Sequence, residues 1–185
     1  MIKILDATPD DAEEILEIYA PYVKETAISF EHEVPALEIF RERIINTLKN
    51  FPYIKAIDEN KNNKIIGYSY AGVFKPRKSY DISCEVSIYV QKNFRGHGAG
   101  RLLYEELEKK LKAQGVFNMY ACVAYPEIED EYLTLNSVKF HEHLGFKIVG
   151  HFNNCAKKFG RFYSMVWLEK FIAPHVIINS GDEKN

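Results

Sequence analysis

A strand-like run that passes through a glycine-rich turn into a helical run is the feature that most restricts how this chain folds. Residues 85–90 read Glu-Val-Ser-Ile-Tyr-Val, residues 95–101 read Arg-Gly-His-Gly-Ala-Gly-Arg, and apolar residues at helical spacing follow from Leu103. Glycines let a backbone turn tightly and approach a ligand closely, and the free N–H groups and dipole of a helix N-terminus attract phosphate oxygens. The segment therefore predicts a site for a phosphorylated cofactor.

Two familiar phosphate-binding loops do not fit the spacing. A nucleotide-binding P-loop needs Lys and then Ser or Thr after its last glycine, but Arg101 follows Gly100 directly. A dinucleotide fingerprint counted from Gly96 needs its third glycine at the position of Arg101. The remaining pattern is Arg95-x-x-Gly98-x-Gly100, for which a glycine-rich turn without any ligand is the alternative interpretation.

Length and composition bound the architecture. With 185 residues and 46% hydrophobic content, the chain suits one domain with a sizeable core. We expect residues 1–171 to form this domain and residues 172–185 to be a polar, frayed tail. Cys84, Cys122 and Cys155 lie far apart without a CxxC pair or histidine-rich neighbours, which predicts reduced thiols and no metal site.

The N-terminus and the charge argue against several partners. Residues 1–6 lack a long apolar signal region, and no run approaches the roughly 18 apolar residues that span a bilayer. We therefore expect a cytoplasmic protein with no membrane partner. A formal net charge of -2 argues against a nucleic-acid partner, and Lys157-Lys158 is too short a basic patch to change that expectation.

Hydrophobic periodicity and turn residues divide the chain into strands and helices. Thr8-Pro9-Asp10-Asp11 supplies a helix start, and Phe40, Ile44 and Leu48 mark the buried face of a second helix. The acidic segment 127–131 is interpreted as a solvated surface loop, with a reshaped pocket mouth as the alternative. We expect strands at residues 2–5, 51–57, 65–74, 85–90, 116–124, 147–152 and 162–168, and further helices after the glycine turn and at residues 134–144.

This order of elements resembles the fold of the GCN5-related N-acetyltransferases (GNAT) across about residues 2–170. The resemblance implies an α/β (α+β) fold in which helices flank a mixed, mostly antiparallel, twisted sheet. Within this superfamily the chain is most similar to the phosphinothricin N-acetyltransferase group. The stretches that carry this closer resemblance are Arg77-Lys78-Ser79-Tyr80, Glu85 with Ile88-Tyr89-Val90, the glycine turn, and Ser137-x-x-x-His141-Glu142-x-Leu144-Gly145-Phe146.

The resemblance implies acetyl-CoA as the cosubstrate, with its diphosphate held by backbone amides at the start of the helix, and no metal. Thr134 stands where the family usually carries an asparagine, and Asn136 lies nearby, so this chain departs from the family at one cofactor contact. The implied cofactor-binding residues are Ile88, Tyr89, Val90, Arg95, Gly96, His97, Gly98, Ala99, Gly100, Arg101, Thr134 and His141.

The resemblance also implies direct attack of a primary amine on the thioester, with Glu85 and His141 as the catalytic candidates. Period-two alternation places Glu85 on the polar face of its strand. A carboxylate with an ordinary pKa of about 4.3 is a weak base at neutral pH, so burial must raise that pKa or a water chain must relay the proton. A strand glutamate paired with a cation is the alternative. His141 can protonate the leaving thiolate, contact the cofactor or simply pack on its helix.

The acyl acceptor is expected to contact Phe30, Arg77, Tyr80 and Glu85, although Phe30 also suits an ordinary core position. The planar guanidinium of Arg77 suits bidentate binding of a carboxylate, phosphinate or sulfone oxygen. We therefore expect an acyltransferase that N-acetylates a small amino-acid-like substrate such as phosphinothricin, methionine sulfone or methionine sulfoximine. A protein or peptide N-acetyltransferase and a catalytically silent CoA-binding sensor are the alternatives. Relatives commonly form homodimers, so the resemblance implies a homodimer here.

Overall fold

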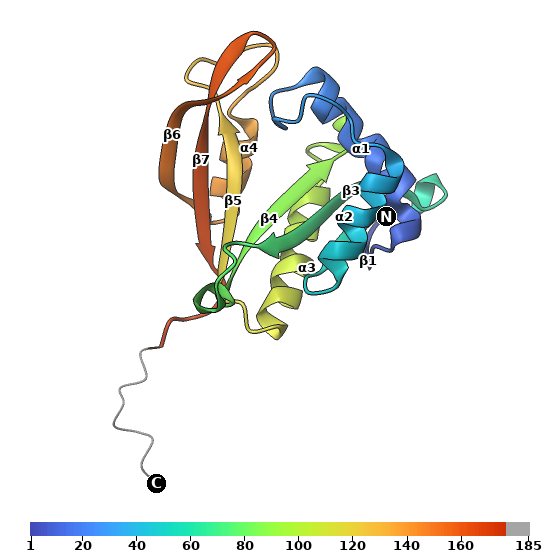
Figure 1. Cartoon of the computed structure of the whole chain (residues 1–185). Helices are drawn as coiled ribbons and strands as arrows, with labels where there is room; N and C mark the ends of the chain where they lie inside the picture. The colour runs from blue at the N-terminus through green and yellow to red at the C-terminus, as the bar shows by residue number, and fades with distance from the viewer. Residues whose placement is uncertain (177–185) are drawn as a thin grey trace.

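A seven-stranded sheet with the order β1-β2-β3-β4-β5-β7-β6 is the centre of the fold (Figure 1). The computed structural model describes residues 1–176. Its strands are β1 (Ile2–Asp6), β2 (Tyr53–Asp58), β3 (Lys64–Val73), β4 (Ser83–Val90), β5 (Asn118–Tyr125), β6 (Lys147–Lys158) and β7 (Arg161–Phe171). The α-helices in this part of the chain are α1 (Ala12–Glu25), α2 (Leu37–Leu48), α3 (Ala99–Ala113) and α4 (Asn136–His143).

Neighbouring strands pair antiparallel everywhere except between β4 and β5, which run parallel. The expected mixed and mostly antiparallel sheet is thus confirmed. The predicted helix start also holds, because the Thr8 amide donates to the Asp11 carboxylate at 2.7 Å in a capping box that precedes α1.

Helices cover both faces of the sheet, and the strands supply two cores by alternation. Tyr53 and Tyr68 belong to the core cluster of α1 and α2, whereas Ile54 and Ile66 belong to the cluster of α3. Figure 1 shows α1 and α2 on one side of the sheet and α3 on the other. The alternating pattern of strand side chains therefore places β2 and β3 between two apolar layers.

The parallel pairing of β4 with β5 is short, and its end opens the sheet. Three residue pairs form it, the last being Glu85 with Tyr120. Beyond this point β4 continues against β3 as far as Val90, while β5 continues against β7 as far as Tyr125. The two strands consequently part in the direction of their C-terminal ends, as Figure 1 shows.

The last hairpin is longer than predicted. Strand β6 extends to Lys158 rather than to residue 152, and β7 runs from Arg161 to Phe171 rather than from 162 to 168. Two register shifts interrupt the pairing of β6 with β7, and Asn154 has a φ of +48° at the second. Such irregularities break the period-two pattern on which strand prediction depends, so the polar half of β6 was missed.

Two further expectations need correction. Leu48 is 36% exposed, because α2 ends at this residue, whereas Phe40 and Ile44 are buried as predicted. The start of the predicted frayed tail is packed: Ile172 is buried and its amide donates to the Phe117 carbonyl at 2.8 Å. The remainder of that predicted tail, residues 177–185, lies outside the described residues.

The acidic segment 127–131 is also more than a solvated loop. Asp130 accepts hydrogen bonds from the amides of Tyr132 and Leu133 at 2.8 Å and from the Tyr163 hydroxyl at 2.9 Å. Glu127 accepts from the Ser164 hydroxyl at 2.9 Å. These contacts join the loop before α4 to strand β7, an arrangement that local sequence does not reveal.

Candidate active site

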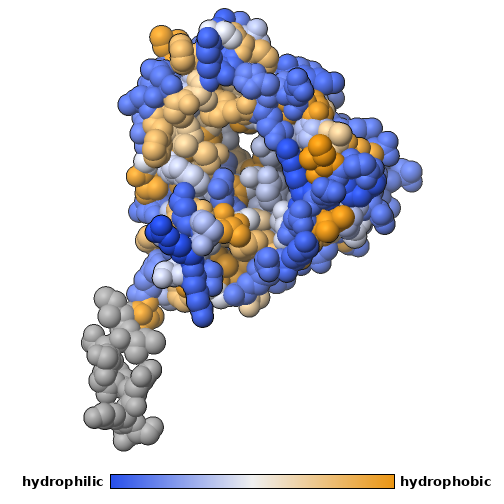
Figure 2. Space-filling model, viewed as in Figure 1, coloured by the Kyte–Doolittle hydropathy of each residue, from blue (hydrophilic) through white to orange (hydrophobic). Residues whose placement is uncertain are grey.

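The gap between β4 and β5 leads into a groove of about 320 Å³. Figure 2 shows the molecular surface from the same viewpoint as Figure 1. An opening is visible there between β5 and the side of the molecule that carries α1. Residues from α1, β4, the glycine turn and the start of α4 meet here. The groove is lined by Tyr22, Ile28, Ile88, Val90, Phe94, Arg95, Gly96, Gly100, Thr134, Asn136, Ser137 and Phe140.

The glycine turn, of which Gly96 and Gly100 line this groove, contains unpartnered amides. Gly96 and Gly98 have φ values of +79° and +86°, a backbone region that L-residues with a Cβ rarely adopt. The first backbone bond of α3 runs from the Leu102 amide to the Gly98 carbonyl at 3.1 Å. The amides of Ala99, Gly100 and Arg101 precede it and, within the described residues, have no backbone acceptor. A diphosphate fits this cradle, because a helix start offers both donors and a positive dipole.

Not every residue of the predicted cofactor set reaches the groove. Ile88, Val90, Arg95, Gly96, Gly100 and Thr134 line it. Arg101 instead pairs with Glu105 of its own helix at 3.3 Å, and His97 bonds the Arg95 carbonyl through Nδ1 at 3.0 Å. Gly98 and Ala99 shape the turn. Thr134 and Asn136 both lie at the groove, so the departure from the family asparagine leaves two polar side chains there.

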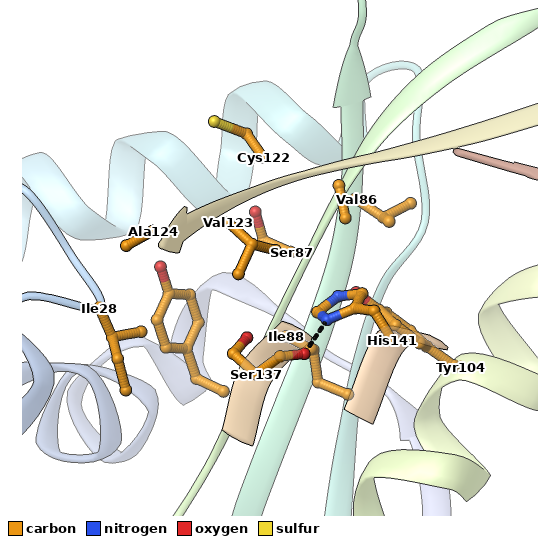
Figure 3. A pocket seen from close by; sticks show the side chains of 12 residues that line it. Ile28, Val86, Ser87, Ile88, Tyr104, Cys122, Val123, Ala124, Ser137 and His141 are labelled. Carbon is orange, nitrogen blue, oxygen red and sulfur yellow. Dashed lines mark hydrogen bonds between the residues drawn. The ribbon is translucent and has the colours of Figure 1, made fainter. Parts of the chain in front are cut away.

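A smaller cavity of about 50 Å³ continues from the groove between the two parted strands. Figure 3 shows His141 and Ser137 of α4 and Tyr104 of α3 on one side of it, with Cys122 and Val123 of β5 on another. Ile28 and Ile88 line both this cavity and the groove. The two spaces therefore adjoin each other, one at the glycine turn and the other in the middle of the sheet.

The hydrogen bonds of His141 show which of its two ring nitrogens carries the proton. Nδ1 lies 2.7 Å from the Ser137 carbonyl oxygen, which only accepts, so this nitrogen carries the proton (Figure 3). Nε2 then accepts from the Tyr104 hydroxyl at 2.8 Å. Burial lowers the pKa of His141 to about 4. At neutral pH the imidazole is uncharged and both of its nitrogens are engaged.

Glu85 occupies the last paired position before the strands part. Burial raises the pKa of its carboxyl group above the ordinary value, and the positive charge of Lys75 opposes that rise. Because the side chain is only half-buried, water can reach it. A half-buried carboxylate of raised pKa, at the point where the two strands part, can accept a proton.

The backbone of β4 also faces the gap. The Gln91 amide donates to Ile66 of β3 at 2.8 Å, whereas the Val90 amide points the other way, to the Tyr22 hydroxyl at 3.3 Å. Strand amides alternate in direction, so the N–H of Ile88 points into the gap as well. It lies beyond the pairing with β5 and is an available donor.

Comparisons with known proteins show the family to which this chain belongs. A family model described as an acetyltransferase (GNAT) domain matches residues 4–167. The chain belongs to the GNAT acetyltransferase family. An L-methionine sulfoximine/L-methionine sulfone acetyltransferase of Pseudomonas aeruginosa is 28% identical over 172 residues, which are 93% of this chain and 95% of that one.

Solved GNAT structures share the fold. A phosphinothricin acetyltransferase from Sinorhizobium meliloti in complex with AcCoA has a TM-score of 0.82 and 29% identity, covering 92% of this chain and 88% of that chain. A ribosomal-protein-alanine N-acetyltransferase from Brucella melitensis has a TM-score of 0.81 and 28% identity, covering 91% and 99%. The expected fold class is confirmed, and the chain is a GNAT acetyltransferase that is similar to phosphinothricin and methionine sulfoximine acetyltransferases.

The residues expected to bind the acyl acceptor of this GNAT protein do not lie together in one cavity. Tyr80 is 39% exposed and packs edge-on against Phe74, with ring centres 5.9 Å apart. Arg77 is exposed. Phe30 is partly buried in a cluster with Ala27 and Tyr163, so its core alternative accounts for what is seen.

An aromatic platform near Glu85 was not predicted. Phe74 stacks on Tyr120 with ring centres 4.3 Å apart and meets Trp167 edge-on at 5.6 Å. The ammonium of Lys75 lies over the rings of Phe74 and Trp167, at 5.1 and 5.7 Å. Lys75 is also the cation whose positive charge opposes the rise in the pKa of Glu85.

Several residues that line the groove or the smaller cavity carried no sequence signal. Tyr22 and Ile28 belong to the first helix and its following loop, and only tertiary packing brings them to β4. Tyr104 occupies a core position of α3, where helical periodicity indicates packing alone.

Within residues 1–176, no helix is long and apolar enough to cross a bilayer. In the same residues, no group of three His, Cys, Asp or Glu side chains is arranged to hold a metal ion.

Proposed function

We propose that the protein transfers the acetyl group of acetyl-CoA to the primary amine of a small amino-acid-like substrate of the phosphinothricin, methionine sulfone or methionine sulfoximine type. The observation that carries the proposal is the groove at the glycine turn together with the adjoining cavity between β4 and β5, whose wall on β4 begins at Val86, directly after Glu85. The names of the relatives at 28% and 29% identity support the acceptor class.

Acetyl-CoA supplies the activated thioester in this proposal, and the residues of the groove position it. The amides of Ala99, Gly100 and Arg101 bind the diphosphate. The Arg95 guanidinium, which lies 5.2 Å from the ring centre of Tyr22, adds positive charge at the groove. The N–H of Ile88 donates to the thioester oxygen and stabilises the negative charge that develops there during attack.

Glu85 removes a proton from the attacking amine nitrogen, directly or through water. The C–N bond forms as the C–S bond of the thioester breaks, and CoA leaves as its thiolate, which takes a proton from water. Its raised pKa makes the carboxylate a stronger base than an exposed glutamate. Lys75 and Arg77 bind the acid group of the acceptor, since both precede β4 and carry positive charge. Tyr80, whose ring packs against Phe74, completes the proposed acceptor site, whereas Phe30 has a packing role.

His141 has a positioning role in this proposal, rather than the role of proton donor to the leaving thiolate. Because burial lowers its pKa to about 4, we expect kcat/KM to show no falling limb with a pKa between 6 and 7. Such a limb, present in the native enzyme and absent in His141→Gln, would contradict this role. Titration of the imidazole by NMR measures the pKa directly and provides the independent check.

The same lowered pKa has a consequence for stability. A histidine whose pKa is lower in the folded state binds more protons when unfolded. The stability contributed by neutral His141 is therefore present above its unfolded pKa of roughly 6.5, and it is lost as the pH falls towards the folded pKa of about 4. Urea unfolding of the native protein and of His141→Gln between pH 4 and 7 tests this difference.

Thiol release from acetyl-CoA across an amine panel tests the proposed function. The panel holds phosphinothricin, methionine sulfone, methionine sulfoximine, free amino acids, polyamines and short peptides. Turnover confined to the amino-acid analogues supports the proposal. Turnover of peptides favours the second candidate, a protein N-acetyltransferase, for which the solved ribosomal-protein-alanine N-acetyltransferase is the supporting observation. Binding of acetyl-CoA without any turnover would favour a CoA sensor.

We also propose that the enzyme acts as a homodimer. The edge strand β6 exposes Ile148, Val149 and Phe152 by 43%, 50% and 49%. A second copy that covers these side chains removes apolar surface from water and protects a sheet edge. Light scattering at micromolar concentration tests the proposal, and a monomeric mass would contradict it.

A further inference from the structure

A buried lysine lies at the tip of the β6–β7 hairpin, outside both cavities. Lys158 is 2% exposed, whereas its neighbour Lys157 is exposed. The Lys158 ammonium donates to the carbonyl oxygens of Val23 at 2.8 Å and Ser29 at 2.6 Å. Burial of an ammonium is unfavourable unless hydrogen bonds compensate it. These contacts, made across more than a hundred residues of sequence, therefore hold the hairpin to the segment that follows α1.

The first acceptor carbonyl belongs to the last turn of α1. If α1 continued, the Ala27 amide would donate to the Val23 carbonyl. It donates to the Tyr132 carbonyl at 3.0 Å instead. The Val23 carbonyl is thus one of the free carbonyls at a helix C-terminus, where a cation also interacts favourably with the helix dipole. Lys158 accordingly satisfies a group that the end of α1 leaves unpaired.

The second acceptor carbonyl lies in the loop between α1 and α2. Ser29 is buried, and its hydroxyl is 2.7 Å from the Tyr19 hydroxyl. Lys158 and Tyr19 therefore hold Ser29 from two directions, one through the backbone and the other through the side chain. Residues 23–29 form a short segment that is fixed at both ends.

Ile28 lies inside this fixed segment and forms part of the wall of both cavities. Figure 3 shows its side chain at the edge of the inner cavity, on the loop that follows α1. A displacement of about 1 Å in such a wall can cost 10²-fold in rate, because acyl transfer requires a near-attack geometry. The position of Ile28 depends on contacts that neither cavity contains.

We propose that Lys158 is a positioning residue, which sets the active-site wall at Ile28 by tying the loop after α1 to the β6–β7 hairpin. The inference rests on the acetyl-transfer function proposed above. Lys158 touches neither cavity and takes no part in the chemistry. Lys158 holds the carbonyls of Val23 and Ser29 in place, and these fix the position of the Ile28 side chain.

Lys158→Met tests the proposal, because methionine keeps much of the apolar stem and removes the ammonium. Lys157→Met is the matched control, since Lys157 is exposed and lies over the Phe162 ring at 5.6 Å. We expect Lys158→Met to raise the acetyl-CoA Kd about tenfold or more and to lower kcat/KM for the amine by up to about 10²-fold, with the loss appearing in kcat as well as in KM. Lys157→Met should change each constant less than about twofold.

Hydrogen exchange supplies a readout that does not depend on turnover. In Lys158→Met the amides of residues 24–31 should exchange faster, while those of α3 keep their native rates. If Lys158→Met does not fold, Tyr19→Phe removes the other contact to Ser29 and should give the same pattern with a smaller effect. Native constants together with native exchange in residues 24–31 would overturn the proposal, and so would faster exchange spread evenly over the chain. If no amine is acetylated, the proposed function fails, but the acetyl-CoA Kd and the exchange pattern still decide the role of Lys158.

Discussion

Glu85→Gln is expected to lower kcat/KM for the amine by about 10²–10⁴-fold, the usual contribution of a positioned general base. The glutamine keeps the size and the hydrogen-bonding ability of the side chain but cannot accept the proton of the amine. The acetyl-CoA Kd should change little, because Glu85 does not line the groove that holds the glycine turn. Steady-state kinetics with the best amine of the panel measures the first quantity, and calorimetric titration measures the second.

The stability of the same variant separates a catalytic role from a structural one. Because burial raises the pKa of Glu85, its ionised form is less favourable in the folded protein than in the unfolded chain at neutral pH. A neutral glutamine should therefore leave Tm at pH 7 unchanged or higher. A glutamate that served mainly as a structural partner of Lys75 would give the reverse, a lower Tm with nearly native kcat/KM.

The pH profile gives a second check on Glu85. A base with a raised pKa produces a rising limb of kcat/KM whose midpoint lies above the roughly 4.3 of an ordinary glutamate. This limb should disappear in Glu85→Gln. Retention of full kcat/KM across the pH range in that variant would remove Glu85 from the mechanism and leave water as the base.

Gly98→Ala is expected to weaken acetyl-CoA binding by roughly 5–30-fold. Gly98 has a φ of +86°, and an L-residue in the left-handed region costs about 1–2 kcal/mol, which corresponds to that factor. Relaxation of this strain turns the amides that follow away from the diphosphate. A Cβ at Gly98 meets no atom within 4 Å, so steric collision does not contribute.

Gly115→Ala is the matched control for Gly98→Ala. Gly115 has a φ of +81° and equally open surroundings, but it follows the other end of α3. Both variants should lose similar thermal stability, whereas only Gly98→Ala should raise the acetyl-CoA Kd. Equal Kd values in the two variants would show that the glycine turn is not the diphosphate site.

Local patterns predicted most of the fold. The strand ending at Val90, the turn with positive φ at Gly98, and the buried leucines of α3 follow from short-range periodicity and from glycine conformation. These preferences operate within a few residues, so a sequence displays them directly. Strand β6 is the exception, because its two register shifts replace the regular alternation.

The active site was predictable only in part. Glu85 and the glycine turn belong to one contiguous stretch, and the sequence places them without reference to any distant residue. The walls of the cavities come from elsewhere: Ile28 from the loop after α1, and Tyr104 from a face of α3 that periodicity assigns to the core. Whether a buried side chain lines a cavity depends on its neighbours in space rather than on its own position in a pattern.

The protonation of His141 is the clearest case of this division. The sequence by itself indicated the strand, the glycine turn and the helix that follows it, because these follow from residue type and spacing, and its resemblance to the GNAT family implied the fold class and the roles of Glu85 and His141. Only the tertiary structure decided that the imidazole is neutral and engaged by Ser137 and Tyr104. A pKa depends on burial and on partners within a few ångströms, and packing alone sets both.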